Sequence, residues 1–233
     1  MKFFRKIRQQ LIGKGDLKRY LLYAIGEVLI IAIGILFALQ LNNWNSSRIE
    51  KQTERKSYEN IKRQILDDFN DLKEVNSFNT HFINQFERAN KYILDNNHNA
   101  IDTLAFIAMN LSQFSDFHSS GNIYETLVNS GDIKLLKNDS ISRNLQKLEM
   151  TYNFINRLED IHWELIINEV SPEMRGIINY STFKILQPDK LYSVELQNIF
   201  FECINLMKIK GSVYKQALDE INEIIFLINK ELN

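Results

Sequence analysis

Apolar residues follow two different patterns along this chain of 233 residues. One apolar stretch, residues 20–41, is almost uninterrupted. After it, apolar positions recur three or four residues apart over three long stretches, at about residues 46–95, 140–170 and 193–232. This spacing is typical of amphipathic helices, and no stretch shows the sustained alternation of a strand. The pattern predicts an all-α protein with a single transmembrane helix followed by a mostly helical extramembrane bundle.

The stretch 20–41 has the length of a membrane span. Its only ionisable side chain is Glu27, and it contains no Lys, Arg, Asp or Pro. At about 1.5 Å per residue it extends roughly 33 Å, enough to cross a hydrocarbon core of about 30 Å. We therefore expect three parts: a basic cytoplasmic or interfacial segment at 1–19, the transmembrane helix, and a helical domain at 42–233.

Turn and cap signals predict the shorter elements of this domain. We expect a helix at about 101–113, a loop at 115–121 and a short helix at 122–129 that ends in a left-handed cap at Gly131. Ser171 and Pro172 stand in the order of a helix start, and Ser193 can cap the last helix. Two regions are expected to be less regular, namely an interruption of the first long helix at 76–79 and irregular chain over 180–192.

The charges are distributed unevenly. Residues 1–41 carry seven basic and two acidic residues, a net charge of +5, which leaves −6 for the rest of the chain. Four basic residues lie in the twenty positions after the span, so the positive-inside rule predicts a cytoplasmic N-terminus and a periplasmic C-terminal domain in a bacterial inner membrane. A cleaved signal peptide is the alternative, but its apolar region would be about 7–15 residues long. A mildly acidic domain argues against nucleic-acid binding.

Several residues are candidates for contact with the membrane interface. Phe3, Phe4 and Ile7 recur at helical spacing among basic residues, which is typical of an amphipathic helix lying in the lipid headgroups. The alternative is a charge cluster that only sets the orientation. The remaining candidates lie at the two ends of the span: Lys18, Arg19, Tyr20, Tyr23 and Trp44.

Four short motifs near the N-terminus suggest a family. They are Lys2-Phe-Phe-Arg-Lys-Ile-Arg-Gln9, Tyr23-Ala-Ile-Gly-Glu27, Ile33-Gly-Ile-Leu36 and Ala38-Leu-Gln-Leu-Asn-Asn-Trp-Asn45. The chain resembles a group of uncharacterised bacterial single-pass membrane proteins over its first 45 residues or so, and more loosely at Tyr124-Glu-Thr-Leu127 with Ser130-Gly131. The resemblance implies an inner-membrane anchor in a bacterium with two membranes. It carries no established activity, substrate or catalytic residue.

Glu27 is the sharpest candidate for a functional side chain. It lies seven residues into the span, about 10 Å deep by helical rise. A carboxyl group within a membrane is a functional hypothesis by default, and Gly26, Gly34 and Ala38 beside it allow another helix to approach closely. An assembly contact is the first interpretation, and ion or proton coupling is the second. The third is a side chain that reaches the headgroups near Lys18 and Arg19.

The soluble domain has one pair with metal-ligand spacing, Glu159 and His162. A di-iron bundle needs two such pairs and two further Glu residues, so His162 is better interpreted as a partly buried, hydrogen-bonded core residue. Cys203, the only cysteine, is best interpreted as a small core residue. No catalytic, cofactor or metal site is predicted.

These observations favour a non-enzymatic assembly or interaction protein whose partners are the lipid bilayer and either copies of itself or another membrane protein. Two alternatives stay open: an ion- or proton-coupled subunit that uses Glu27, and a periplasmic ligand-sensing bundle that signals through a partner. An enzyme without a sequence signature is a further alternative.

Overall fold

The computed structural model describes residues 17–119 and 121–233, and almost all of them are helical. The predicted all-α fold is confirmed. The chain divides into two compact units, Met1–Thr53 and Glu54–Asn233. The described part of the first unit is a single helix, and the second unit is a helical bundle.

The longest element is α2, which runs without a break from Leu17 to Leu94. Its N-terminal part contains an apolar window in which no residue is buried. By length and composition, α2 is the one helix among the described residues that is able to cross a membrane. The predicted interruption at 76–79 is wrong. Asn79 stays in the helix because its side chain turns inward and donates to the carbonyl oxygen of Met207 at 2.8 Å, rather than competing for its own backbone.

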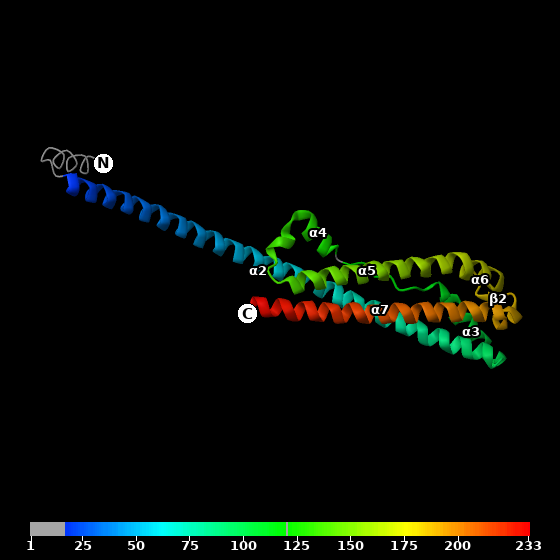
Figure 1. Cartoon of the computed structure of the whole chain (residues 1–233). Coiled ribbons are helices and arrows are strands. Elements are labelled where there is room, and N and C mark those ends of the chain that lie inside the picture. The colour runs from blue at the N-terminus through cyan, green and yellow to red at the C-terminus, as the bar shows by residue number, and fades with distance from the viewer. Residues whose placement is uncertain (1–16, 120) are drawn as a thin grey trace. The chain divides into compact units, whose positions relative to one another are not determined.

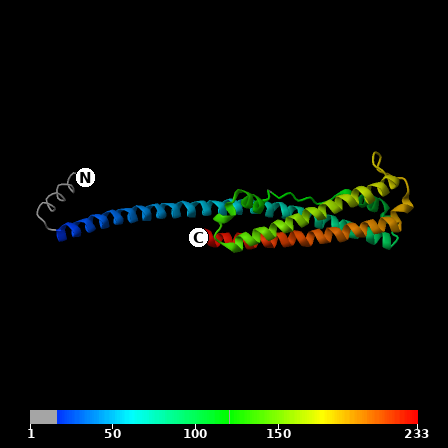
Figure 2. The ribbon, with the colours of Figure 1, turned by 45° about the horizontal axis from the view of Figure 1, so that its top comes forward.

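Three long helices build the bundle, as the apolar spacing predicts. They are the part of α2 from Glu54 onward, α5 (Asp139–Leu165) and α7 (Val194–Leu232). Two views show α5 and α7 side by side along their length and running in opposite directions (Figures 1 and 2). Their inward faces carry the predicted stripes. On α5, His162 is buried and its neighbour Trp163 is half exposed.

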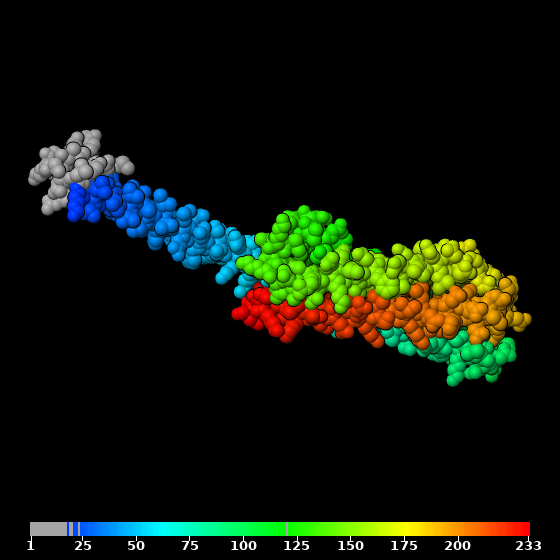
Figure 3. Space-filling model, in the orientation of Figure 1, coloured from blue at the N-terminus to red at the C-terminus, as the bar shows by residue number. Residues whose placement is uncertain are grey.

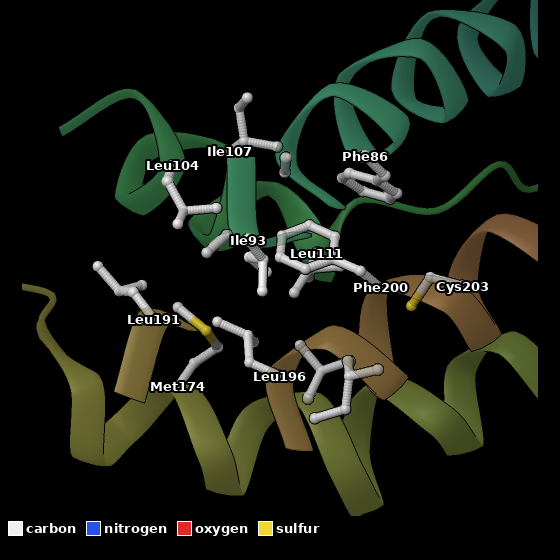
Figure 4. Packing of buried hydrophobic residues seen from close by; sticks show 14 of the residues in the cluster. Phe86, Ile93, Leu104, Ile107, Leu111, Met174, Leu191, Leu196, Phe200 and Cys203 are labelled. Atoms are coloured by element: carbon white, nitrogen blue, oxygen red, sulfur yellow. The ribbon is translucent and has the colours of Figure 1, made fainter. Parts of the chain in front are cut away.

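Two apolar clusters fill the interior of the bundle. The first, here called the Phe86 cluster, contains buried residues from 86–111, 166–178 and 191–207. Figure 4 shows its side chains converging from several elements, with Phe86 and Phe200 in contact at 5.8 Å between ring centroids. The second, here called the Ile155 cluster, contains buried residues from 58–72, 117–158 and 213–228. Cys203 belongs to the first cluster and is fully buried, which confirms its predicted core role.

Short elements connect the long helices. The 3₁₀ turn η1 (His98–Ala100) leads into α3 (Ile101–Met109), and η2 (Asn110–Ser112) ends that segment. Extended chain follows, then α4 (Ile123–Ser130) and η3 (Asp132–Leu135). In the space-filling view, α4 stands out from the side of the bundle (Figure 3). The predicted cap at Gly131 is confirmed, because this residue adopts φ +80°, a conformation that glycine reaches without steric cost.

The end of α5 differs from the prediction of one helix to residue 170. After Leu165 the chain widens into a single π-helical turn, η4 (Ile166–Val170), before α6 (Ser171–Ile177). Pro172 lacks the backbone N–H that an α-helix would donate four residues back, and its ring crowds that carbonyl. A π turn at this position accommodates the missing donor, and such turns are frequent at functional sites.

The region 180–192, predicted to be irregular, contains some regular structure. A two-residue antiparallel hairpin pairs β1 (Ile178–Asn179) with β2 (Lys184–Ile185). The Asn179 side chain closes its turn by accepting hydrogen bonds from the backbone of Ser181 and Thr182. The 3₁₀ turn η5 (Pro188–Tyr192) then leads to α7. Ser193 caps α7 as predicted, accepting from the Leu196 N–H.

Candidate functional site

A layer of buried polar side chains separates the two apolar clusters. Each long helix passes from one cluster to the other through this layer, which is made by residues exposed by 5% or less. We call the set the polar layer; its members are Asn79, Ser115, Glu159, His162, Lys210 and Tyr214. Buried charges and amides in the middle of an otherwise apolar core are costly unless they are well paired, so this layer is the strongest candidate site in the bundle.

Helical spacing explains how α5 and α7 supply their members. Glu159 and His162 are three residues apart on α5, and Lys210 and Tyr214 are four apart on α7. Both separations place two side chains on the same helix face. Gly211 has a packing role, because a β-carbon there would lie 3.2 Å from the Asn79 amide nitrogen.

Extended chain also contributes to the polar layer, beside α2, α5 and α7. Residues 113–119, here called the strap, cross the layer between η2 and α4 without regular secondary structure. Ser115 and Phe117 point inward and are buried, whereas Asp116 and His118 are exposed. The strap therefore presents one face to the layer and the other to solvent.

Lys210 holds the strap by its backbone. Its Nζ donates to the Ser115 carbonyl oxygen at 2.6 Å and lies 3.5 Å from the Nδ1 of His162. The ammonium is also 5.8 Å from the centre of the Phe114 ring. Burial lowers the pKa of Lys210, an effect that the charge of Glu159 partly offsets.

Glu159 holds the strap from the other side. Its Oε1 accepts from the Phe117 N–H at 3.0 Å and from the Tyr214 hydroxyl at 2.6 Å. The hydroxyls of Tyr214 and Ser115 are 2.9 Å apart, which links these contacts into one network. Burial raises the pKa of Glu159, and the hydrogen bond from Tyr214 and the charge of Lys210 oppose that rise.

His162 is held neutral. Burial, followed by the nearby charge of Lys210, lowers its pKa to about 3. Its Nε2 is buried and has no hydrogen-bond partner. The predicted core position is confirmed, and the side chain is fully rather than partly buried. Among residues 17–119 and 121–233 its polar contact is the long one to Lys210. Among residues 17–119 and 121–233, no three His, Cys, Asp or Glu side chains form a group able to hold a metal ion.

Two grooves flank the strap. A groove of about 420 Å³ lies on the α2 side, where Asp71, Glu74 and Phe78 face strap residues. A second groove of about 330 Å³ lies on the α5 side, where Asn156, Glu159 and Asp160 do the same. Asp116 and His118 border both grooves. Any movement of the strap therefore changes the shape of two surface grooves.

The predicted membrane residues lie elsewhere, in the first unit. Glu27, Gly26, Gly34 and Ala38 all belong to the described part of α2, and a β-carbon on either glycine would meet nothing within 4 Å. The side chains of Lys18 and Trp44 are exposed. Arg19, Tyr20 and Tyr23 lie in α2, and their side chains are outside the described set; Phe3, Phe4 and Ile7 lie outside the described residues.

Sequence reasoning singled out Glu159 and His162 but missed Lys210. The signal was present, since Lys210 lies three residues after Met207 and four before Tyr214, within the apolar stripe of α7. A lysine in such a stripe usually extends to solvent. Here the hydrogen bond to the strap carbonyl and the charge of Glu159 favour its burial.

No family model, no curated protein and no solved structure matches the chain.

Proposed function

We propose that this protein is a non-enzymatic, single-pass inner-membrane protein that assembles through its transmembrane helix and carries a periplasmic helical domain for interaction with a partner. The exposure of apolar side chains on α2 carries the proposal. Val28, Ile30 and Leu36 point in different directions around the helix, and each is about two-thirds exposed. Exposed apolar surface of this extent is unfavourable in water and is typical of contact with lipid or another helix.

Two glycines in this segment support assembly. Glycine inside a helix costs roughly 0.5–1 kcal/mol relative to alanine. Nothing in the described chain approaches Gly26 or Gly34 closely enough to require a missing side chain. A second helix packed against the face that contains Glu27, Gly34 and Ala38 supplies a reason for the small residues.

The orientation in this proposal is supported by the charge distribution. Seven basic residues precede the span and four lie in the twenty positions after it, which favours retention of the N-terminus in the cytoplasm and export of the domain. The family resemblance at residues 2–45 implies the same location.

The test is the mass of the full-length protein in lipid nanodiscs. We expect a defined oligomer for the wild type and a smaller species for Glu27→Gln and for Gly34→Leu. Ala32→Leu is the matched control, because it adds the same side chain to a different face of the helix. A wild-type monomer, or an oligomer unchanged by both variants, would contradict assembly through this face.

A second candidate function is ligand sensing by the bundle. The polar layer favours it, because two charged side chains fix a strap that borders two surface grooves. In this alternative the bundle changes shape at the strap and signals through a membrane partner. Proton coupling at Glu27 is the remaining alternative, and partner activity that is unaffected by Glu27→Gln would remove it.

A further inference from the structure

The carboxyl group of Glu159 connects the strap to α7. Both hydrogen bonds that it accepts end on Oε1, one from the Phe117 backbone and one from the Tyr214 hydroxyl. The side chain is 5% exposed and lines the groove on the α5 side of the strap. The strap is therefore the cover that keeps water from this carboxyl group.

Glu159 has no direct counter-ion within the described chain. The ion pairs formed by residues 17–119 and 121–233 do not include it. The nearest buried cation, Lys210, directs its ammonium to the Ser115 carbonyl oxygen and to His162 instead. An ionised carboxylate in this position must be stabilised by two hydrogen bonds and by distant charge, which is a costly arrangement.

We infer that Glu159 is a proton-binding site that controls the strap: the protonated carboxyl keeps residues 113–119 closed over the polar layer, and the ionised carboxylate favours their opening to water. The inference is independent of the proposed membrane assembly, because every group involved lies between Glu54 and Asn233.

Proton linkage gives the direction in which pH shifts the strap between its closed and open states. Burial raises the pKa of Glu159 from 4.5 to about 7 in the closed state. When the strap opens and water reaches the carboxyl group, the pKa falls toward its ordinary value. Proton uptake therefore favours closure, and this contribution is fully present below about pH 4.5 and is lost as the pH rises through about 7.

Other titratable groups lie in this layer or beside it. Lys210 and Tyr214 from α7 and His162 from α5 lie in the layer. Asp116, His118 and Asp160 border the groove beside it. From α2 the layer receives the uncharged Asn79, while Asp71 and Glu74 face the strap from its other side. Because lowering the pH charges His162 and Lys210 more readily in an open state, the wild-type profile alone does not isolate Glu159.

The experiment therefore compares two proteins at each pH. Hydrogen–deuterium exchange of the peptide covering residues 113–119 is measured in full-length wild type and Glu159→Gln, in detergent micelles, at pH 5.5 and pH 8.5. Gln keeps an oxygen that accepts both hydrogen bonds and cannot ionise. Intrinsic exchange rates and the other titrating groups cancel in the ratio of the two proteins.

We expect the strap of the wild type to exchange about tenfold faster than that of Glu159→Gln at pH 5.5, and about three-hundredfold faster at pH 8.5. The ratio should change by about thirtyfold, the value that linkage gives for this difference in pKa. Glu164→Gln, the same change at an exposed position of α5, should leave the ratio to wild type near one at both pH values. A ratio for Glu159→Gln that does not depend on pH would overturn the inference.

Tyr214→Phe provides a second variant if Glu159→Gln fails to fold. The Tyr214 hydroxyl lowers the pKa of Glu159. Its removal should therefore raise that pKa and move the acceleration of strap exchange to a higher pH. A transition at the wild-type pH would contradict a role for Glu159 in holding the strap.

Discussion

Residues 24–41 of α2 expose apolar side chains on every side, whereas the middle of the bundle encloses Glu159 and Lys210. Both regions reverse the usual partition of apolar groups inside and charged groups outside. In α2 the reversal supports the proposed contact with lipid or with another helix. In the bundle Glu159 and Lys210 both form hydrogen bonds with the strap, so the reversal indicates a segment that is held by specific contacts rather than by packing alone.

The largest effect is expected when charge is placed in the apolar segment of α2. Leu29→Arg combined with Ile33→Arg should cost roughly 5–7 kcal/mol of membrane insertion, at about 2.5–3.5 kcal/mol for each arginine near the centre of a span. The double variant should be released from membranes by alkaline carbonate, whereas the wild type should require detergent. Ile49→Arg, beyond the span on the same helix, is the control and should behave as wild type. Retention of the double variant would contradict a lipid environment for this segment.

Removing apolar volume from the bundle should have the next largest effect. Phe200 is fully buried against Phe86, so Phe200→Ala should destabilise the bundle by about 3–5 kcal/mol. Its neighbour Phe201 is 57% exposed, and Phe201→Ala should change the free energy of unfolding by only about 0.5 kcal/mol. Urea unfolding followed by circular dichroism measures both values. Equal effects would mean that the Phe86 cluster is not the core.

Substitution of Lys210 tests the role of the buried charges, because it removes one of them and leaves its partners in place. Lys210→Met deprives the Ser115 carbonyl of its donor and Glu159 of the nearest cation, which should cost about 2–4 kcal/mol at pH 8. The cost should be smaller at pH 5.5, because burial raises the pKa of Glu159 to about 7 and the carboxyl is then neutral. Lys208→Met, which removes an exposed ion pair with Glu87, should cost less than about 1 kcal/mol at either pH. A cost for Lys210→Met that is independent of pH would separate Lys210 from Glu159.

His162 gives the smallest predicted effect. Its pKa is lowered to about 3 in the folded protein, below the value of 6.5 expected for an unfolded chain. A lowered pKa means that its contribution to stability is present above about pH 6.5 and is lost as the pH falls, by about 2 kcal/mol at pH 5. His162→Leu should remove this part of the acid sensitivity, and His118→Leu, at a largely exposed side chain, should not. Identical pH profiles of unfolding for wild type and His162→Leu would contradict the burial of a neutral imidazole.

The three long helices could be predicted from spacing alone, because each needs only a local apolar stripe. The caps at Gly131 and Ser193 were predictable from the residue types at the helix ends. The polar layer was not, because it depends on contacts between residues far apart in sequence. Lys210 bonds to a carbonyl 95 residues away, and the strap alternates over too few positions to stand out as extended structure. The π turn follows from the missing N–H of Pro172, and the hairpin from the side chain of Asn179, which are single-residue effects without periodicity.

The central claim, a membrane-anchored protein with an exported bundle, is tested most directly by thiol labelling in intact cells. The native Cys203 is fully buried, and burial raises its pKa to about 12. Cys203→Ala removes this thiol, so that labelling reports only on an introduced cysteine. Asn153→Cys then places one thiol on an exposed position of α5. In a bacterium with two membranes, a reagent that passes the outer but not the inner membrane should label this thiol before lysis, in protein recovered with the membrane fraction. Labelling only after the inner membrane is broken would contradict the export of the bundle.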